Sequence, residues 1–105
     1  MTDKIIALTT AGSEEEARSI SHALVERHLA ACVNIIPRIV SVYEWQGELE
    51  ESDEWLLVIK TTSASFERVR DAITDLHSYD VPECICVTIE DGSPAYLQWI
   101  GETVK

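Results

Sequence analysis

The chain has 105 residues, enough for a single domain spanning residues 1–105, and 46% of them are hydrophobic. Its 19 acidic and 8 basic residues give a formal net charge of −11, which opposes binding to nucleic acid or to an anionic membrane. No apolar run approaches the length of a membrane span, and the first ten residues do not resemble an export signal. We therefore expect a cytoplasmic protein.

The first third of the chain predicts a strand followed by a helix. Residues 4–10 are mostly apolar and read as a short buried strand. Ser13 and Glu16 form the capping-box pattern that starts a helix, which we expect to run through residues 12–30. Its apolar side chains recur at helical spacing: Ala17, Ile20, Leu24, and His28 or Leu29.

A long β-hairpin is predicted in the middle of the chain. Residues 32–45 are rich in β-formers, and Pro37, which lacks an amide donor, predicts a bulge or an edge within them. Gln46 and Gly47 suit the hairpin turn. The return strand starts at residue 48, and we expect its acidic stretch, residues 50–54, to be solvated.

The last third predicts a helix, a strand and a closing helix. Residues 65–77 carry an apolar stripe at helical spacing, and residues 84–89 read as a strand. Ser93 is placed to cap the terminal helix, with Pro94 at its first position. The resulting β-α-β-β-α-β order with a C-terminal helix is that of an α+β, ferredoxin-like domain.

The strands of this sheet are apolar on both faces. Two helices cover only one face, and a solvated second face should alternate apolar with polar residues. The segments "IIAL", "EWLLVI" and "CICVTI" do not alternate. We therefore expect another copy of the chain to cover the second face.

Four blocks of sequence together are similar to one known family. They are "AACVNIIP" at 30–37, "SVYEWQGELEESDEWLLVIKT" at 41–61, "HSYDVPE" at 77–83 and "YLQWI" at 96–100. In order and spacing they resemble the CutA family of divalent-cation tolerance proteins. The resemblance implies a homotrimer with hairpins that contribute to inter-subunit sheets, and an architecture like that of the PII signalling proteins, whose ligands bind between subunits.

The resemblance also implies a metal ligand set for Cu²⁺ or another divalent cation. His77 belongs to the motif H-x-Y-x-x-P-E, although this chain has serine at the position after the histidine, where proline is usual. Bacterial relatives in which copper binding is discussed carry a cysteine and a second histidine at the positions of Thr9 and Leu76. The candidate metal ligands here are His77, Glu83 and Cys32; the alternative for His77 is a structural role at a helix end.

A second set of residues predicts a pocket between subunits. Tyr43, Trp45 and Tyr79 are its aromatic candidates. Lys60 interrupts an otherwise apolar strand, so it needs either a salt bridge, to Glu83 or to a neighbouring subunit, or an anionic ligand in a cleft. The alternative function is therefore a PII-like signalling or scaffold trimer that binds a small anion or a protein.

The cysteines and the remaining motifs predict no enzyme. An odd number of cysteines without a C-x-x-C pair indicates reduced thiols. Cys84 and Cys86 could hold Cu(I), but we expect both to be buried apolar residues. We expect Tyr96 and Trp99, on the terminal helix, to be packing residues rather than parts of the pocket. The chain has no nucleophile elbow, phosphate loop or H-E-x-x-H motif.

Overall fold

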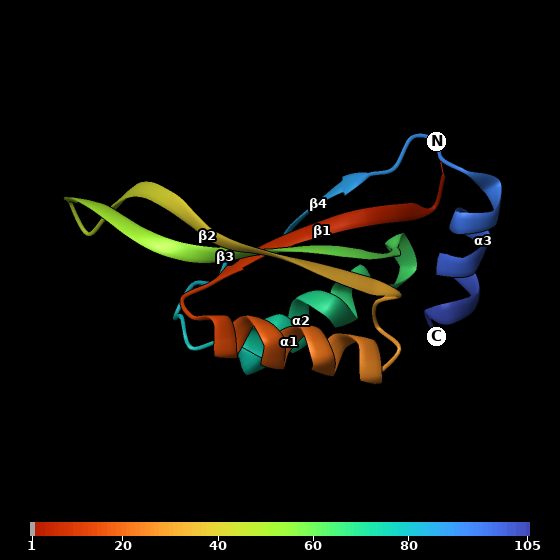
Figure 1. The fold of residues 1–105 in the computed structure, drawn as a ribbon, viewed down its shortest axis with the longest axis horizontal. Helices are drawn as coiled ribbons and strands as arrows, with labels where there is room; N and C mark the ends of the chain where they lie inside the picture. Colours follow the sequence, from red (N-terminus) through yellow and green to blue (C-terminus); the bar gives the residue numbers. More distant parts are fainter. Residues whose placement is uncertain (1) are drawn as a thin grey trace.

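Residues 2–105 are described by a computed structural model, and within them four strands and three α-helices form an α+β fold (Figure 1). In chain order the elements are β1 (Lys4–Ala11), α1 (Glu14–Glu26), β2 (Cys32–Trp45), β3 (Glu48–Thr62), the 3-10 turn η1 (Ser63–Ser65), α2 (Phe66–Leu76), β4 (Ile85–Thr88) and α3 (Pro94–Thr103). The strands pair antiparallel in the order β2-β3-β1-β4. This confirms the ferredoxin-like prediction, with its long central hairpin and C-terminal helix.

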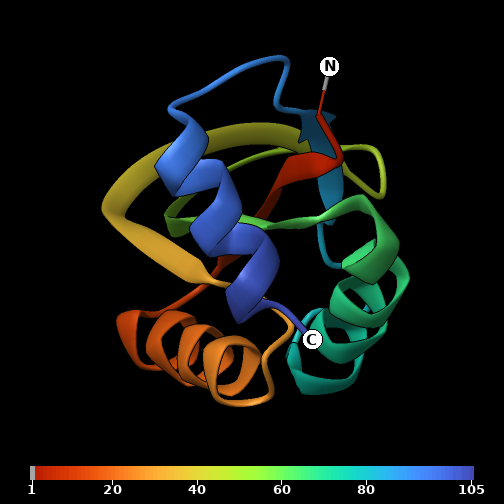
Figure 2. The same cartoon turned by 90° about the vertical axis from the view of Figure 1, so that its right-hand side faces the viewer.

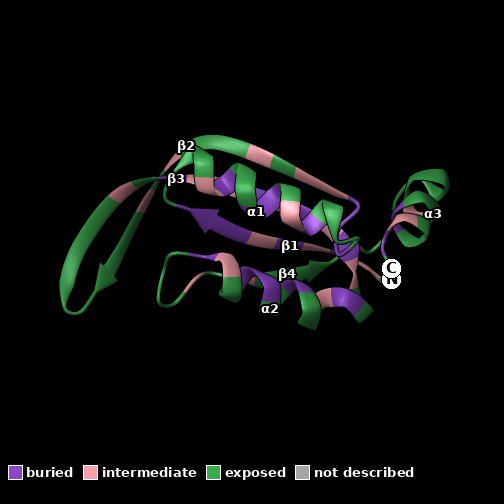
Figure 3. Ribbon diagram, turned by 90° about the horizontal axis from the view of Figure 1, so that it is seen from below, coloured by how far each residue is buried: buried purple, intermediate pink, exposed green. Residues whose placement is uncertain are grey.

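The hydrophobic core lies between the sheet and the two helices α1 and α2. Alternate residues of the central strands, such as Ala7, Leu57 and Ile59, are fully buried on that face. Leu24 of α1 and Ile73 of α2 meet them from the helix side, also fully buried. Figure 3 shows the buried stripes of both helices against the buried central strands.

Helix α1 begins as predicted and ends earlier than predicted. The Ser13 hydroxyl accepts a hydrogen bond from the Glu16 amide at 3.1 Å, which satisfies one free donor of the first turn. The helix stops at Glu26 because His28 takes a left-handed conformation with φ of 59°. Leu29 is therefore buried from the connecting loop rather than from the helix.

The hairpin contains the predicted irregularities. Pairing of β2 with β3 shifts register between Ile36 and Ile39, around Pro37, and Arg38 has a φ of 51°. Gln46 and Gly47 close the turn with φ of 51° and 80°, both in the left-handed region. Beyond the bulge, residues 39–54 form an arm that projects from the body, as Figure 1 shows.

Helix α3 lies across one end of the sheet (Figure 2). It packs there through Ile100 and Val104 against Ala31. Tyr96 and Trp99, predicted to be packing residues, pack their rings on each other with centroids 5.5 Å apart and remain 43% and 42% exposed. The Ser93 side chain makes no capping hydrogen bond, although Pro94 takes the predicted first position. Within residues 2–105 no helix is long and apolar enough to cross a membrane.

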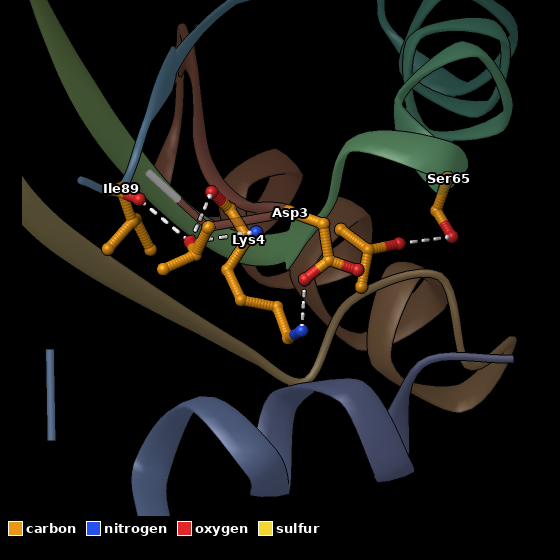
Figure 4. Close-up of polar contacts among 6 residues, drawn as sticks. Asp3, Lys4, Ser65 and Ile89 are labelled. Carbon is orange, nitrogen blue, oxygen red and sulfur yellow. Dashed lines mark hydrogen bonds and ion pairs between the residues drawn. The ribbon is translucent and has the colours of Figure 1, made fainter. Parts of the chain in front are cut away.

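Beside α3, the start of β1 is joined to the chain that leaves β4. The Thr2 hydroxyl donates to the Ile89 carbonyl at 2.7 Å (Figure 4). The Ile89 amide donates to the Lys4 carbonyl at 3.0 Å. These bonds extend the β1–β4 pairing past the last residue of β4. The Lys4 ammonium pairs with Asp3 at this end of the sheet.

The outer sheet face and the edge strand β4 are only partly covered. Ile36, Ile85 and Val87 are 43%, 54% and 52% exposed. Cys84 packs against the core, whereas the prediction that Cys86 is buried is wrong. The reason is that β4 is a four-residue edge strand that pairs only with β1 in the described chain.

Candidate functional site

A cleft of about 720 Å³, here named the hairpin-root cleft, extends along the hairpin arm from Glu54 at its base to Trp45 beside its turn. Its walls come from the arm, from the end of β1 and from the loop between α2 and β4. The lining residues are Thr10, Ser41, Val42, Tyr43, Trp45, Glu54, Ser78, Tyr79, Asp80, Val81 and Glu83. This set includes three acids and, among the described residues, no lysine, arginine or histidine. The hairpin-root cleft therefore has a negative lining with aromatic walls.

Glu54 is the most buried acid of the cleft, at 7% exposure. Its carboxylate accepts a hydrogen bond from the Tyr79 hydroxyl at 2.7 Å. Burial, and then the hydrogen bond to Glu54 and its charge, raise the pKa of Tyr79 far above its usual range, so the phenol stays protonated and remains a donor. The expectation that residues 50–54 are all solvated is therefore wrong at Glu54, because the loop after α2 folds over it.

Close packing holds the Tyr79 hydroxyl in place. A Cβ atom added at Gly12 would lie 3.0 Å from that hydroxyl. A glycine at this position therefore leaves room for Tyr79 to reach Glu54.

The Tyr43 hydroxyl, on the arm, lies 3.3 Å from the Ser52 hydroxyl at an exposed position.

The negative charge of Glu54 acts on the carboxyl group of Glu83. Partial burial raises the pKa of Glu83, and the charge of Glu54 raises it further. Two interacting carboxyl groups without a basic neighbour in the cleft lining make it costly for both to be ionised at once. A bound cation would remove this cost, so the pair favours positively charged ligands.

His77 is a buried residue that contacts the backbone through both of its ring nitrogens. Its side chain is fully buried, and Nε2 lies 2.6 Å from the Thr10 carbonyl oxygen. The backbone amide of Tyr79 donates to Nδ1 at 3.1 Å. Since Nδ1 accepts, the proton is on Nε2, which donates to Thr10. Both ring nitrogens are therefore engaged, and a metal could bind Nδ1 only if the Tyr79 amide moved away.

Glu16 approaches the same histidine rather than its own helix cap. Its Oε1 lies 3.2 Å from His77 Nδ1 and has no hydrogen-bond partner among the described residues. The predicted capping box is thus only half formed, because the Glu16 carboxylate turns towards His77 at the end of α2. With Nδ1 already accepting from Tyr79, this contact is not a hydrogen bond.

The three candidate metal ligands do not meet within one chain. His77 contacts Thr10, near the end of β1, and Glu83 lines the cleft. Cys32 starts β2, where it pairs with Lys60 nearer the α3 end of the sheet. No group of three or more histidine, cysteine or acidic side chains in residues 2–105 is arranged to hold a metal ion.

Three of the four residues predicted for a pocket between subunits lie together in one cleft of the chain, and Lys60 lies outside that cleft. Tyr43, Trp45 and Tyr79 all line the hairpin-root cleft, whereas Lys60 does not. The Lys60 ammonium donates to the side-chain oxygen of Asn34, the next outer-face residue of the adjacent strand. The predicted salt bridge from Lys60 to Glu83 is not formed in the chain.

Glu54 is the site residue that the sequence pattern did not reveal. It sits at the end of an acidic run, which is typical of a solvated segment, yet the apolar strand "WLLVI" follows at once. The change from acidic to apolar residues directly after Glu54 was the one signal in the sequence that this acid lies near the core. Its contact with Tyr79, 25 residues away, depends on how the loop after α2 packs and has no pattern in the sequence.

Known proteins similar to this chain share its fold over nearly the whole length. A family model described as CutA1 divalent ion tolerance protein matches residues 5–103. The divalent-cation tolerance protein CutA of Thermus thermophilus is 47% identical over 97 residues, 92% of this chain and 94% of that protein. A solved structure of the Cut A1 protein from Thermus thermophilus covers 97% of this chain and 99% of its own, with a TM-score of 0.95 and 45% identity.

Two further relatives contradict the prediction of a cytoplasmic protein. The solved CutA of Archaeoglobus fulgidus, described as periplasmic, is 42% identical with a TM-score of 0.94 and covers 97% of this chain and 99% of its own. The CutA of Arabidopsis thaliana, described as chloroplastic, is 39% identical over 96% of this chain and 56% of that protein.

Proposed function

The chain belongs to the CutA1 divalent ion tolerance protein family, and from that premise we propose that it is a binding protein, not an enzyme, that acts in metal-ion tolerance as a homotrimer. We place the bound divalent cation in the hairpin-root cleft. The acid pair at its base, Glu54 and Glu83, is the observation that carries the proposal.

The chemistry of the cleft favours cations. Carboxylate oxygens are good ligands for divalent ions, and the phenol oxygen of Tyr79 lies against one of them at 2.7 Å. One chain supplies too few ligands for a tight site. A second subunit that closes the cleft, or bound water, would complete the coordination. For Cu²⁺, which imidazole suits, His77 would join the site after release of its Nδ1, and Cys32 would belong to a separate position.

The uncovered apolar surface supports a homotrimer. Ile85 and Val87 are about half exposed on the outer sheet face, and Val40, Val42 and Leu49 on the arm are 60%, 62% and 80% exposed. A monomeric protein rarely leaves so much apolar surface in water. The family resemblance implies three copies, with each arm reaching a neighbour. A particle of three times 11.8 kDa in solution is the expected result, and a stable monomer at micromolar concentration would contradict it.

The alternative, a PII-like trimer that binds a small anion, has less support. The cleft lining is acidic, and Lys60 lies outside it with its ammonium bonded to Asn34. An anion in the cleft would meet Glu54, Asp80 and Glu83 without a compensating basic side chain in that lining.

Calorimetric titration with Cu²⁺ and Zn²⁺ tests the proposal. We expect saturable binding with a simple ratio of metal to subunit, weakened in Glu83→Gln and unchanged in Glu51→Gln, an exposed acid on the arm outside the cleft. His77→Ala reports on the histidine, with circular dichroism as a check that it still folds. Weak, unsaturable binding that is equal in all variants would mean that a surface of charge −11 attracts cations without a site, and would refute the proposal.

A further inference from the structure

Two of the free cysteines lie together at the edge strand β4. Cys84 directly precedes β4, and Cys86 is the second residue of the strand. Side chains two residues apart on a strand point to the same face of the sheet, with about 6.5 Å between their α-carbons. Burial raises the pKa of the Cys84 thiol, and the charge of Cys86 raises it further, so the two thiols lie close enough to interact.

Both thiols lie on the helix side of the sheet, away from the surface that we assign to subunit contact. Cys86 pairs with Ala7, which is fully buried under the helices, and Cys84 packs against the same core. Ile85 and Val87 alternate with the cysteines and are about half exposed on the outer face. A second copy of the chain that covers the outer face therefore leaves the thiols on the opposite side of the sheet.

The two thiols differ in how far water reaches them. Cys84 is half-buried, whereas Cys86 is exposed although it faces the helix side. The reason is that β4 ends the sheet, and Figure 3, seen from the helix side, shows it exposed beside α2. The guanidinium charge of Arg70, on α2, acts on Cys84 and favours its thiolate. The pair thus has one sulfur fixed against the core and one that an ion can reach from solvent.

Two neighbouring thiols suit a soft ion of low coordination number. In residues 2–105 no third histidine, cysteine or acid joins them in a metal-binding group. Zn²⁺ takes four ligands in structural sites, whereas thiolates select Cu(I), which is stable between two sulfur atoms. With metal–sulfur bonds of about 2.3 Å, as in zinc sites, the sulfur atoms would lie about 4.6 Å apart. Rotation of both side chains towards each other allows this approach.

We propose that Cys84 and Cys86 form a two-coordinate site for Cu(I) on the helix side of β4. Cu(I) replaces the thiol protons, which pass to solvent, so the affinity rises with pH. The positive ion also removes the repulsion between the two thiolates. This site is separate from the hairpin-root cleft and does not depend on the divalent cation proposed there.

An anaerobic titration of the reduced, whole protein with Cu(I) tests this inference. A coloured Cu(I) chelator, bathocuproine disulfonate, competes for the ion and reports the amount bound. We expect one Cu(I) for each chain and an ultraviolet absorption band from the copper–thiolate bonds. Cys86→Ser, a change at an exposed position, should weaken binding more than about 100-fold, because even residues behind the ligands contribute roughly 10–100-fold. Cys32→Ser is the matched control and should bind as the wild type does, because β2 does not pair with β4.

A second measurement checks that the site is open in the assembled protein. N-ethylmaleimide should modify Cys86 in the native particle, as peptide mass spectrometry would show. One equivalent of Cu(I) should protect Cys86 from the reagent. Zn²⁺ should give no such protection, since two thiols supply only half of its usual ligands.

Four results would overturn the inference. A Cys86 that reacts with the reagent only after unfolding would mean that another copy of the chain covers it. Equal Cu(I) binding by the wild type and Cys86→Ser would place the ion elsewhere. One Cu(I) for two or three chains would place it between subunits, and equal protection by Zn²⁺ would show no preference for a soft ion. Cu(I) binding at the cysteines without calorimetric binding of Zn²⁺ would support this inference and refute the cleft site, so the two failures are distinguishable.

Discussion

Replacing Tyr79 by phenylalanine tests the link between the loop after α2 and the hairpin. The change removes the hydroxyl that donates to Glu54 at 2.7 Å and leaves the ring in place. Glu54 is 7% exposed, so water cannot fully take the place of the lost donor. Hydrogen bonds to charged groups contribute about 1.5–3 kcal/mol, and we expect the free energy of unfolding to fall by about 2 kcal/mol.

A second tyrosine in the same cleft provides the control. The Tyr43 hydroxyl lies 3.3 Å from Ser52 at an exposed position, where water can replace it. Tyr43→Phe should therefore cost less than about 0.5 kcal/mol, as surface changes usually do. Urea unfolding of both variants, at one fixed protein concentration because assembly adds to apparent stability, gives the comparison.

A double-mutant cycle separates the hydrogen bond from other effects of the change. With Glu54→Gln already present, the Tyr79 hydroxyl bonds to a neutral group, and Tyr79→Phe should then cost only about 1 kcal/mol. If Tyr79→Phe costs no more than Tyr43→Phe, or costs the same with and without Glu54→Gln, the bond to the buried carboxylate does not stabilise the fold.

Three further predictions concern other parts of the chain. Gly12→Ala should cost about 1 kcal/mol of unfolding free energy because the new Cβ would lie 3.0 Å from the Tyr79 hydroxyl, and should cost less when Tyr79→Phe removes that oxygen. Leu24→Ala should cost about 2–5 kcal/mol by urea unfolding, against less than about 1 kcal/mol for the 39% exposed neighbour in Val25→Ala. The folded-state pKa of Glu83 is raised above 4.5, so the folded state holds more protons above that pH, and stability should fall as pH rises through the folded pKa. Unfolding measured from about pH 4 to pH 8 should show this fall in the wild type and less of it in Glu83→Gln.

The sequence by itself determined the elements that have local causes. Ser13 starts α1 through a bond to an amide three residues away, and Pro37 disrupts the ladder at its own position because it has no N–H. Gly47 readily accepts the positive φ that the two-residue hairpin turn requires, and Gln46 adopts a positive φ beside it. These signals act over a few residues, so the order of strands and helices, and with it the ferredoxin-like topology, could be predicted.

Only the tertiary structure decided which polar residues are buried and what they contact. His77 bonds to Thr10, 67 residues away, and Glu54 bonds to Tyr79, 25 residues away. Cys86, predicted to be buried, is exposed because β4 lies at an edge of the sheet. Such outcomes depend on strand register and on how a loop packs across the sheet. An apolar pattern records whether a side chain prefers to be buried, but not which distant partner it meets.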